Sequence, residues 1–262
     1  GEPFLLMAGF FSTHIPYIAP RKYFDMYPLE SVPIRREILA GANGIGEWVY
    51  LYDLPREPRI PETQLRELTR AYYACASFVD AQIGRVIEAV GRLGLEDDTI
   101  IVVWSDHGYS IGEHGYWGKG RLNEVCTRIP MLMRLPGSGT GGRTVSSLVE
   151  TIDLFPSLCD LCGLAVPEDM EGKSFLPVLR DPSLPGKPAV FGRTPSARTV
   201  RTDRYRCTEY LKRVGITQRC ELYDHETDPG ETTNLAGDPR LRDVRTRLEG
   251  LLRTAWTAKG RE

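Results

Sequence analysis

An aspartate and a histidine near the middle of the sequence are placed as metal ligands would be. Asp106 and His107 directly follow Thr99–Trp104, a β-branched apolar run that predicts a strand buried on both faces. In an open parallel sheet, ligands bind beyond the carboxyl ends of the strands. Gly108 comes next and lets the backbone turn. The pattern indicates a metal site. The alternative is an aspartate that caps the following segment, beside a solvent-exposed histidine.

A glycine-rich loop follows and ends in a lysine. The run Ile111–Lys119 contains three glycines, an acid and a histidine, and it can bring Lys119 back over the metal site. Metal ligands beside an ammonium group form a pocket for a tetrahedral oxyanion, because fixed positive charge stabilises negative charge in a dry cleft. His14, after the apolar run Phe4–Phe11, could bind the same anion or protonate a leaving group. An ordinary loop histidine is the alternative.

The small number of histidines bears on which metal is expected. The chain has four: His14, His107, His114 and His225. A two-zinc phosphatase site on a comparable sheet uses more imidazoles than this chain can readily supply. A single hard cation held mainly by oxygen ligands fits better, so we expect calcium or magnesium rather than zinc.

The composition is that of a folded domain. The 262 residues carry 33 Lys and Arg against 35 Asp and Glu, a formal net charge of −2, and 41% are apolar. This balance gives no general attraction to nucleic acid or to an anionic membrane surface. The longest apolar run, Phe4–Phe11, is far shorter than the roughly 20 residues of a membrane span. We therefore expect no nucleic-acid partner and no membrane span, and the sequence leaves the cellular compartment open.

Six cysteines are too few for a disulfide scaffold. Cys159 and Cys162 have the C-x-x-C spacing, but no second pair or nearby histidine completes a zinc site. We interpret both as small core residues on one helix face. A zinc or nucleic-acid module is therefore disfavoured. Cys207 and Cys220 could bridge a hairpin, which the sequence alone does not decide.

Hydrophobic periodicity predicts the elements that position these side chains. Apolar residues three or four apart predict helices at Leu65–Val90, Thr151–Gly163 and Leu241–Trp256. Short apolar runs predict strands at Phe4–Phe11, Thr99–Trp104 and Met131–Leu135, and shorter segments predict two or three antiparallel strands within Thr202–Tyr223. The fold class is thus α/β. Residues 1–170 are expected to form part of a mixed, mostly parallel sheet flanked by helices, and residues 171–262 a small α+β subdomain with an antiparallel sheet.

Three motifs around the predicted metal site resemble those of the sulfatases in the alkaline-phosphatase superfamily. They are Ser105-Asp106-His107-Gly108, Gly112-Glu113-His114-Gly115 and Trp117-Gly118-Lys119. The aspartate is followed by histidine rather than asparagine, which makes the sequence most similar to the iduronate-2-sulfatase-like branch. Further similar segments follow the family's order along nearly the whole chain: Tyr73–Gly84, Asp153–Leu158, Gly172–Phe175, Glu221–Asp224 and Asp228–Leu235.

The resemblance implies a role for each of four residues. Asp106 and His107 would be calcium ligands, and Lys119 would contact the sulfate oxygens. His14 would bind the sulfate and assist the ester oxygen. Ser12 stands where the family usually has a lysine, so the leaving-group side of the pocket departs from the family pattern. The implied activity is calcium-dependent hydrolysis of a sulfate ester of a small molecule or glycan, with a sugar sulfate expected.

The implied nucleophile is a formylglycine made from the first residue of a Cys/Ser-x-Pro-x-Arg motif. None of the six cysteines has a proline two positions later, and the paired acidic ligands of the family's first strand are not found. We therefore expect the C-terminal half to two-thirds of a sulfatase, inactive by itself and completed by an N-terminal half in cis or in trans. The alternatives are a phosphodiesterase or phosphonate monoester hydrolase of the same superfamily, or a non-catalytic truncated subunit.

Overall fold

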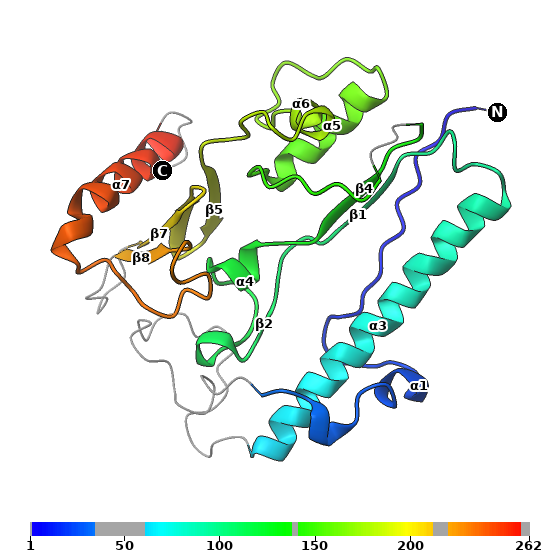
Figure 1. Cartoon of the computed structure of the whole chain (residues 1–262), viewed down its shortest axis with the longest axis horizontal. Helices are drawn as coiled ribbons and strands as arrows, with labels where there is room; N and C mark the ends of the chain where they lie inside the picture. The colour runs from blue at the N-terminus through cyan, green and yellow to red at the C-terminus, as the bar shows by residue number, and fades with distance from the viewer. Residues whose placement is uncertain (1, 35–60, 138–140, 212–219, 258–262) are drawn as a thin grey trace.

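The computed structural model describes residues 2–34, 61–137, 141–211 and 220–257. Figure 1 shows a long helix with the N-terminal segment beside it, a central pair of strands, and a C-terminal sheet with a helix packed on it. The helices and 3-10 helices are α1 (Arg21–Phe24), η1 (Leu29–Ser31), α3 (Glu62–Arg92), η2 (Glu113–Gly115), α4 (Glu124–Thr127), η3 (Thr151–Asp153), α5 (Leu154–Leu161), α6 (Leu176–Arg180), η4 (Pro239–Leu241) and α7 (Arg242–Thr257). The strands are β1 (Ile101–Trp104), β2 (Ser110–Ile111), β3 (Trp117–Gly118), β4 (Met131–Arg134), β5 (Val190–Thr194), β6 (Ala197–Arg201), β7 (Tyr205–Tyr210) and β8 (Cys220–Asp224).

The long helix α3 confirms the helix predicted from residue spacing. Its apolar side buries Leu65 and Cys75. The segment that contains α1 and η1 packs against α3 (Figure 1), where Arg70 donates to the Phe24 carbonyl oxygen at 2.9 Å. This part of the predicted irregular region 17–61 is thus tied to the helix; the rest, 35–60, lies outside the described residues.

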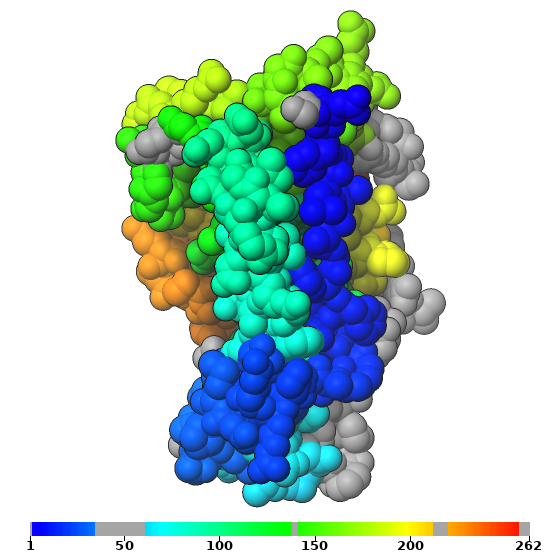
Figure 2. Space-filling model, turned by 90° about the vertical axis from the view of Figure 1, so that its right-hand side faces the viewer, coloured from blue at the N-terminus to red at the C-terminus, as the bar shows by residue number. Residues whose placement is uncertain are grey.

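The N-terminal apolar run is not a buried strand, so that prediction is wrong. Residues 4–11 form no strand, and Leu5 and Met7 are about four-fifths exposed. The run lies beside α3 (Figure 2). No strand among the described residues pairs with it, and a strand is buried on both faces only when it has neighbours to pair with and layers to cover it. The apolar residues of this run favour burial, but they do not determine whether other strands lie beside it.

The central strands β1 and β4 confirm the two strands predicted after α3, but the predicted burial of β1 on both faces is wrong. Three of its residues are half-buried and Trp104 is 43% exposed, because β1 pairs with β4 alone among the described residues. The two strands pair antiparallel, with Val102 opposite Met133 and Trp104 opposite Met131. One face of the pair packs against α5 and α6 through Leu154 and Phe175. Every strand pair among the described residues is antiparallel, so the parallel part of the expected sheet is not formed by these residues.

The C-terminal part is an antiparallel sheet in the order β5-β6-β7-β8. Strands β7 and β8 confirm the antiparallel strands predicted within Thr202–Tyr223, whereas β5 and β6 precede that range and were not predicted. Helix α7, predicted at Leu241–Trp256, covers one face. Leu248 and Leu252 of α7 are fully buried there against Val200 and Leu222 of the sheet. Burial of such side chains contributes about 1.5–3 kcal/mol each to folding, which accounts for the stable attachment of this helix.

The boundary expected between residues 1–170 and 171–262 stays a prediction. Phe175, beyond it, packs on Leu154, before it. Lys187, also beyond it, places Nζ 2.7 Å from Asp153 Oδ1, so the two parts are in contact across this boundary.

Asp153 precedes α5, but its carboxylate makes no capping bond to that helix and instead accepts from the Glu150 amide at 2.9 Å.

The interpretation of both C-x-x-C cysteines as core residues is correct for one of them. Cys159 is buried on α5, but Cys162 is exposed, so only one residue of the C-x-x-C is a core residue. Helix α5 ends at Leu161, so Cys162 lies outside it and does not share the buried helix face of Cys159.

Among the described residues, no helix has the length and apolar character that crossing a membrane would require.

Candidate active site

Asp106 and His107 lie just beyond β1, as predicted, and their side chains converge. His107 Nε2 is 3.5 Å from Asp106 Oδ2. The other ring nitrogen, Nδ1, lies 2.8 Å from the Gly108 carbonyl oxygen and must donate to it, since a carbonyl only accepts. This leaves the Nε2 lone pair available for a metal. Asp106 Oδ1 accepts from the His107 amide at 3.0 Å, which orients the carboxylate.

The donor pair fits part of a calcium shell. A spacing of 3.5 Å between two ligand atoms is compatible with one cation at the usual distance of about 2.3–2.6 Å from oxygen. Calcium takes about six to eight ligands, however, and no third His, Cys, Asp or Glu of the described residues joins Asp106 and His107 in one cluster. These two side chains would therefore be two of several ligands.

The glycine-rich loop forms a hairpin that places Lys119 beside the segment after His107. Strand β2 begins three residues after His107 and pairs with β3, with Ser110 opposite Gly118. Lys119 follows Gly118 and is half-buried, and no acidic side chain of the described residues pairs with its ammonium group. The hairpin thus places Lys119, whose ammonium group has no acidic partner among the described residues, directly after the strand that pairs with the segment following His107.

A chain of aromatic hydrogen bonds joins three separate segments at this place. Trp117 Nε1 donates to the Tyr17 hydroxyl at 3.0 Å, and that hydroxyl donates to the Tyr109 hydroxyl at 2.9 Å. The ring of Tyr72, on α3, stacks on Tyr109 with 5.4 Å between centroids. Burial, followed by the hydrogen bond to Tyr109, raises the pKa of Tyr17 and keeps this hydroxyl protonated as a donor.

These aromatic residues bring the segment of His14 to the other candidates. Tyr17 is three residues after His14, Tyr109 two after His107, and Trp117 two before Lys119. His14 itself is exposed, and its Nδ1 donates to the Ile15 carbonyl oxygen at 2.7 Å, which leaves Nε2 for a ligand. The roles of His14, Asp106, His107 and Lys119 stay predictions.

The sequence analysis missed the aromatic residues that hold the segments together. The available signal was an aromatic side chain two or three positions from each candidate: Tyr17, Tyr109 and Trp117. Their function as a connector could not be read from sequence, because it depends on contacts between residues about a hundred positions apart.

Gly108 allows the metal-binding segment to contact α4 closely. Its amide donates to the Cys126 carbonyl oxygen at 2.9 Å. A Cβ atom at this position would lie 2.1 Å from the Val125 carbonyl oxygen, a distance that no side chain can adopt without moving the backbone. The glycine is therefore required by packing, and it fixes Asp106 and His107 relative to α4.

A buried ion-pair network joins α4 to the C-terminal sheet. Arg206, on β7, is 3% exposed, and it places Nη2 2.5 Å from Glu124 Oε2 and Nε 2.6 Å from Glu231 Oε1. Glu231 also accepts from the Glu124 amide at 2.7 Å and contacts His225 Nε2 at 2.8 Å. Burial would raise the pKa of Glu231, but the hydrogen bond from His225 and the charge of Arg206 outweigh it and hold the pKa below its usual value.

This network includes a second group with metal-ligand residue types. Ligand atoms of Glu124, His225 and Glu231 all lie within 4.8 Å of one another. The guanidinium of Arg206, however, already bonds to both carboxylates. An arginine is always charged in proteins and cannot leave as a proton would. We interpret this cluster as an ion-pair network rather than a metal centre.

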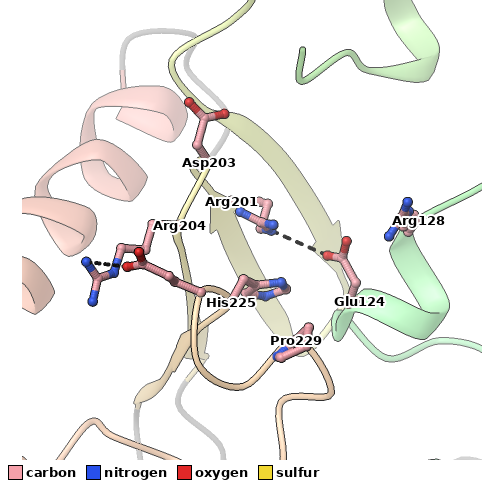
Figure 3. Close-up of a pocket in the computed structure, with 8 residues that line it drawn as sticks. Glu124, Arg128, Arg201, Asp203, Arg204, His225 and Pro229 are labelled. Carbon is pink, nitrogen blue, oxygen red and sulfur yellow. Dashed lines mark hydrogen bonds and ion pairs between the residues drawn. The ribbon is translucent and has the colours of Figure 1, made fainter. Parts of the chain in front are cut away.

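An open pocket of about 610 Å³ lies beside the network. Figure 3 shows Arg128, the residue after α4, and Arg201, at the end of β6, on either side of Glu124, with His225 between Glu124 and Arg204. Arg201 pairs with Glu124 at 3.4 Å, and Arg204 pairs with Asp224, the last residue of β8, and with Glu226. Arg128 is exposed and pairs with no acidic side chain of the described residues. Arg128 is two residues after Cys126, so the pocket adjoins the segment of Asp106 and His107.

The nucleophile motif admits serine in its first position, and one serine has the required spacing. Ser31-Val32-Pro33-Ile34-Arg35 reads Ser-x-Pro-x-Arg. Ser31 ends the 3-10 helix η1, is exposed, and donates to the Pro28 carbonyl oxygen at 2.8 Å. Nothing in the described structure connects it with Asp106 or Lys119. The spacing alone therefore does not identify Ser31 as the nucleophile.

The described residues form an α/β fold of the alkaline-phosphatase type, with Asp106 and His107 just beyond β1. Residues 1–164 match the sulfatase family model, and residues 112–257 match the model of the C-terminal part of N-sulphoglucosamine sulphohydrolase. The chain belongs to the sulfatase family, as its motifs predict.

Individual relatives agree with this assignment. A sulfatase of Formosa agariphila is 33% identical over 96% of this chain and 50% of its own length, and human iduronate 2-sulfatase is 27% identical over 93% of this chain and 60% of its own. A structure solved with its substrate D-glucosamine-2-N,6-O-disulfate has a TM-score of 0.79 at 22% identity, covering 94% of this chain and 63% of that one. The phosphonate monoester hydrolase of Silicibacter pomeroyi has a TM-score of 0.75 at 26% identity, covering 94% and 54%. The chain spans about half the length of the relatives it matches.

Replacing Gly108 by alanine is expected to displace α4 and to lower stability. Forcing a methyl group against the Val125 carbonyl costs about 1–3 kcal/mol. Gly84→Ala is the matched control, because a Cβ there meets nothing within 4 Å and alanine is the better helix former. Thermal unfolding should show a lower Tm for Gly108→Ala and an equal or higher Tm for Gly84→Ala. Equal Tm values for Gly108→Ala and the wild type would contradict the close contact.

Removing the guanidinium of Arg206 is expected to be strongly destabilising. Arg206→Met leaves two buried carboxylates without their partner, which costs about 3–5 kcal/mol in the free energy of unfolding. Arg21→Met is the control, since its side chain is 92% exposed and surface changes usually stay within about 0.5 kcal/mol. Urea denaturation of both variants measures the difference. A loss below about 1 kcal/mol for Arg206→Met would show that the network is not structural.

Proposed function

We propose that this chain provides part of the active site of a sulfuric ester hydrolase that acts on a sulfated glycan. The observation that carries the proposal is the aromatic hydrogen-bond chain, because it gathers the segments of His14, His107 and Lys119 in a chain of the sulfatase family. The whole protein's activity depends on further residues. We propose that a formylglycine nucleophile comes from an N-terminal half of the fold, in cis or in trans.

The four predicted residues have separate tasks in this proposal. Lys119 binds the sulfate oxygens with its ammonium group and stabilises the negative charge that develops on them. His14, in its imidazolium form, keeps Nδ1 donating to the Ile15 carbonyl oxygen and donates its Nε2 proton to the leaving alcohol. Asp106 and His107 hold a calcium ion, which when bound would polarise the sulfate. Their converging Oδ2 and Nε2 atoms support this assignment.

The arginine-lined pocket supports a glycan as substrate. A sulfated sugar carries anionic groups besides the ester that is cleaved, and exposed guanidinium groups bind sulfate and carboxylate well. Arg128 is available for such a contact, and the pocket adjoins the metal-binding segment. The names of the relatives point the same way, since iduronate 2-sulfatase is named for a sulfated sugar and one related structure holds a disulfated glucosamine.

Loss of the Lys119 ammonium should impair turnover of the protein expressed from its complete reading frame. For Lys119→Ala we expect kcat to fall about 10²–10³-fold, the usual effect of removing one donor to a developing oxyanion. Lys173→Ala is the control, because the Lys173 side chain is exposed and the residue is more than fifty positions after Lys119 in the sequence. Release of sulfate from a sulfated glucosamine oligosaccharide is the assay.

A comparison of two aryl esters, followed by release of their common alcohol, separates the sulfatase from its alternative. The proposed enzyme should have a higher kcat/KM for an aryl sulfate than for a phosphonate monoester of the same alcohol. The reverse order would favour the phosphonate monoester hydrolase reading that a related structure suggests.

Calcium should stabilise the protein through Asp106. Ligand binding to the native state raises stability by about 2.7 kcal/mol at a concentration one hundred times Kd, so calcium chloride should raise Tm and a chelator should reverse the shift. Asp106→Asn should lose the shift, and Asp97→Asn, in an exposed turn, should keep it. Magnesium should give a smaller shift. An undiminished calcium shift in Asp106→Asn would place the ion elsewhere.

Arg128→Ala should weaken glycan binding selectively. We expect KM for the sulfated oligosaccharide to rise about tenfold, equal to about 1.4 kcal/mol, with little change for a small aryl sulfate that cannot reach the pocket. Arg143→Ala, at an exposed arginine, is the matched control. An equal rise in KM for both substrates would mean that Arg128 positions the site rather than binding the glycan.

A further inference from the structure

Two cysteines of the C-terminal sheet lie in contact without a disulfide between them. Cys207 is on β7 and Cys220 begins β8, and their Sγ atoms are 3.3 Å apart. In the ladder, Cys207 is opposite Leu222 and Cys220 is opposite Glu209. The two cysteines are therefore diagonal neighbours on one face of the sheet, a position from which side chains can still reach each other.

The surroundings of the two thiols differ. Cys207 is fully buried among Val200, Leu248 and Leu252 beneath α7, and no small oxidant in solution can reach it. Cys220 is half-buried and lies at the start of its strand. The hydrogen bond to Cys220 and then burial raise the pKa of Cys207, so its thiol stays protonated.

We propose that Cys207 and Cys220 are a redox-active pair that closes to a disulfide by exchange with a small disulfide such as oxidised glutathione. The accessible Cys220 thiolate attacks one sulfur of glutathione disulfide, and a glutathione thiolate leaves, giving a mixed disulfide on Cys220. Cys207 then attacks Cys220 Sγ and breaks its bond to glutathione, and the Cys207 proton passes to the departing glutathione thiolate, which leaves as the thiol. Two protein thiols are oxidised, and one glutathione disulfide is reduced to two thiols.

A disulfide has an S–S length of about 2.05 Å, so the two sulfurs must approach by about 1.2 Å from their present 3.3 Å. Diagonal neighbours in a ladder lie about 7–8 Å apart, so the start of β8, which carries Cys220, must also shift toward β7. The product joins β7 to β8 and closes a loop of the intervening residues, which stabilises the fold chiefly by restricting the unfolded chain. The joined strands carry Arg206, next to Cys207, and lead into His225, after β8. The bond would therefore hold the hairpin on which the ion-pair network rests.

The test oxidises the folded protein with glutathione disulfide and compares it with protein kept in dithiothreitol. We expect a mass loss of about 2 Da, no bound glutathione, and one cross-linked peptide pair that contains Cys207 and Cys220. Thiol titration after denaturation should find four of the six thiols left. The Tm of the oxidised protein should be higher by about 4 °C or more, and dithiothreitol should reverse the shift.

Two variants and one matched control make the outcome decisive. Cys220→Ser should abolish both the cross-link and the Tm shift, and Cys207→Val, which keeps an apolar side chain in the core, should leave glutathione bound to Cys220. Cys162→Ser, at an exposed cysteine outside the pair, should behave as the wild type. Six thiols remaining after oxidation, a cross-link that includes Cys162, or a wild-type protein that keeps glutathione on Cys220 would each overturn the proposal. A Cys207–Cys220 cross-link without a rise in Tm would overturn its stabilising role.

Discussion

The buried guanidinium of Arg206 is the interaction on which the arrangement of this chain depends. It lies between Glu124 of α4 and Glu231 beyond β8, two carboxylates more than a hundred positions apart in sequence. A buried charge is tolerated only when it is paired and hydrogen-bonded, and the planar guanidinium offers donors in fixed directions. Satisfying both carboxylates therefore sets one orientation of α4 on the C-terminal sheet. Because the Cys126 carbonyl of α4 accepts from Gly108, that orientation is passed on to the metal-binding segment.

The candidate site is held from its other side by aromatic residues rather than by charges. Tyr17, Tyr109 and Trp117 form a half-buried hydrogen-bond chain across three segments. Their rings bury apolar area while each polar atom finds a partner, so the segments are joined without a desolvation penalty. The aromatic residues hold the segments together, so the charged side chains of the candidate site are not needed for that purpose. Asp106 is largely exposed, and Lys119 has no acidic partner among the described residues. Such groups are available to an ion or a substrate.

Much of the fold followed from local patterns. Helices α3 and α7 were predictable because apolar residues at helical spacing identify a buried face whatever covers it. The strands β1 and β4 were predictable from short continuous apolar runs. The run at residues 4–11 failed because its burial depends on neighbouring strands, which its own residues do not encode. Register and strand number in the C-terminal sheet likewise depend on contacts between segments, and the sequence indicated only that short antiparallel strands lie there.

The sequence by itself determined the chemistry that is available: an aspartate and histidine after a strand, a lysine after a glycine-rich loop, and the motifs of the sulfatase family. Residue types and short spacings carry that information, because ligand chemistry belongs to side chains. Only the tertiary structure decided how those groups are held. The connection through Tyr17, the requirement for glycine at position 108, the burial of Arg206 and the contact of Cys207 with Cys220 all join residues distant in sequence. Such contacts arise when whole elements pack, and no local pattern encodes them.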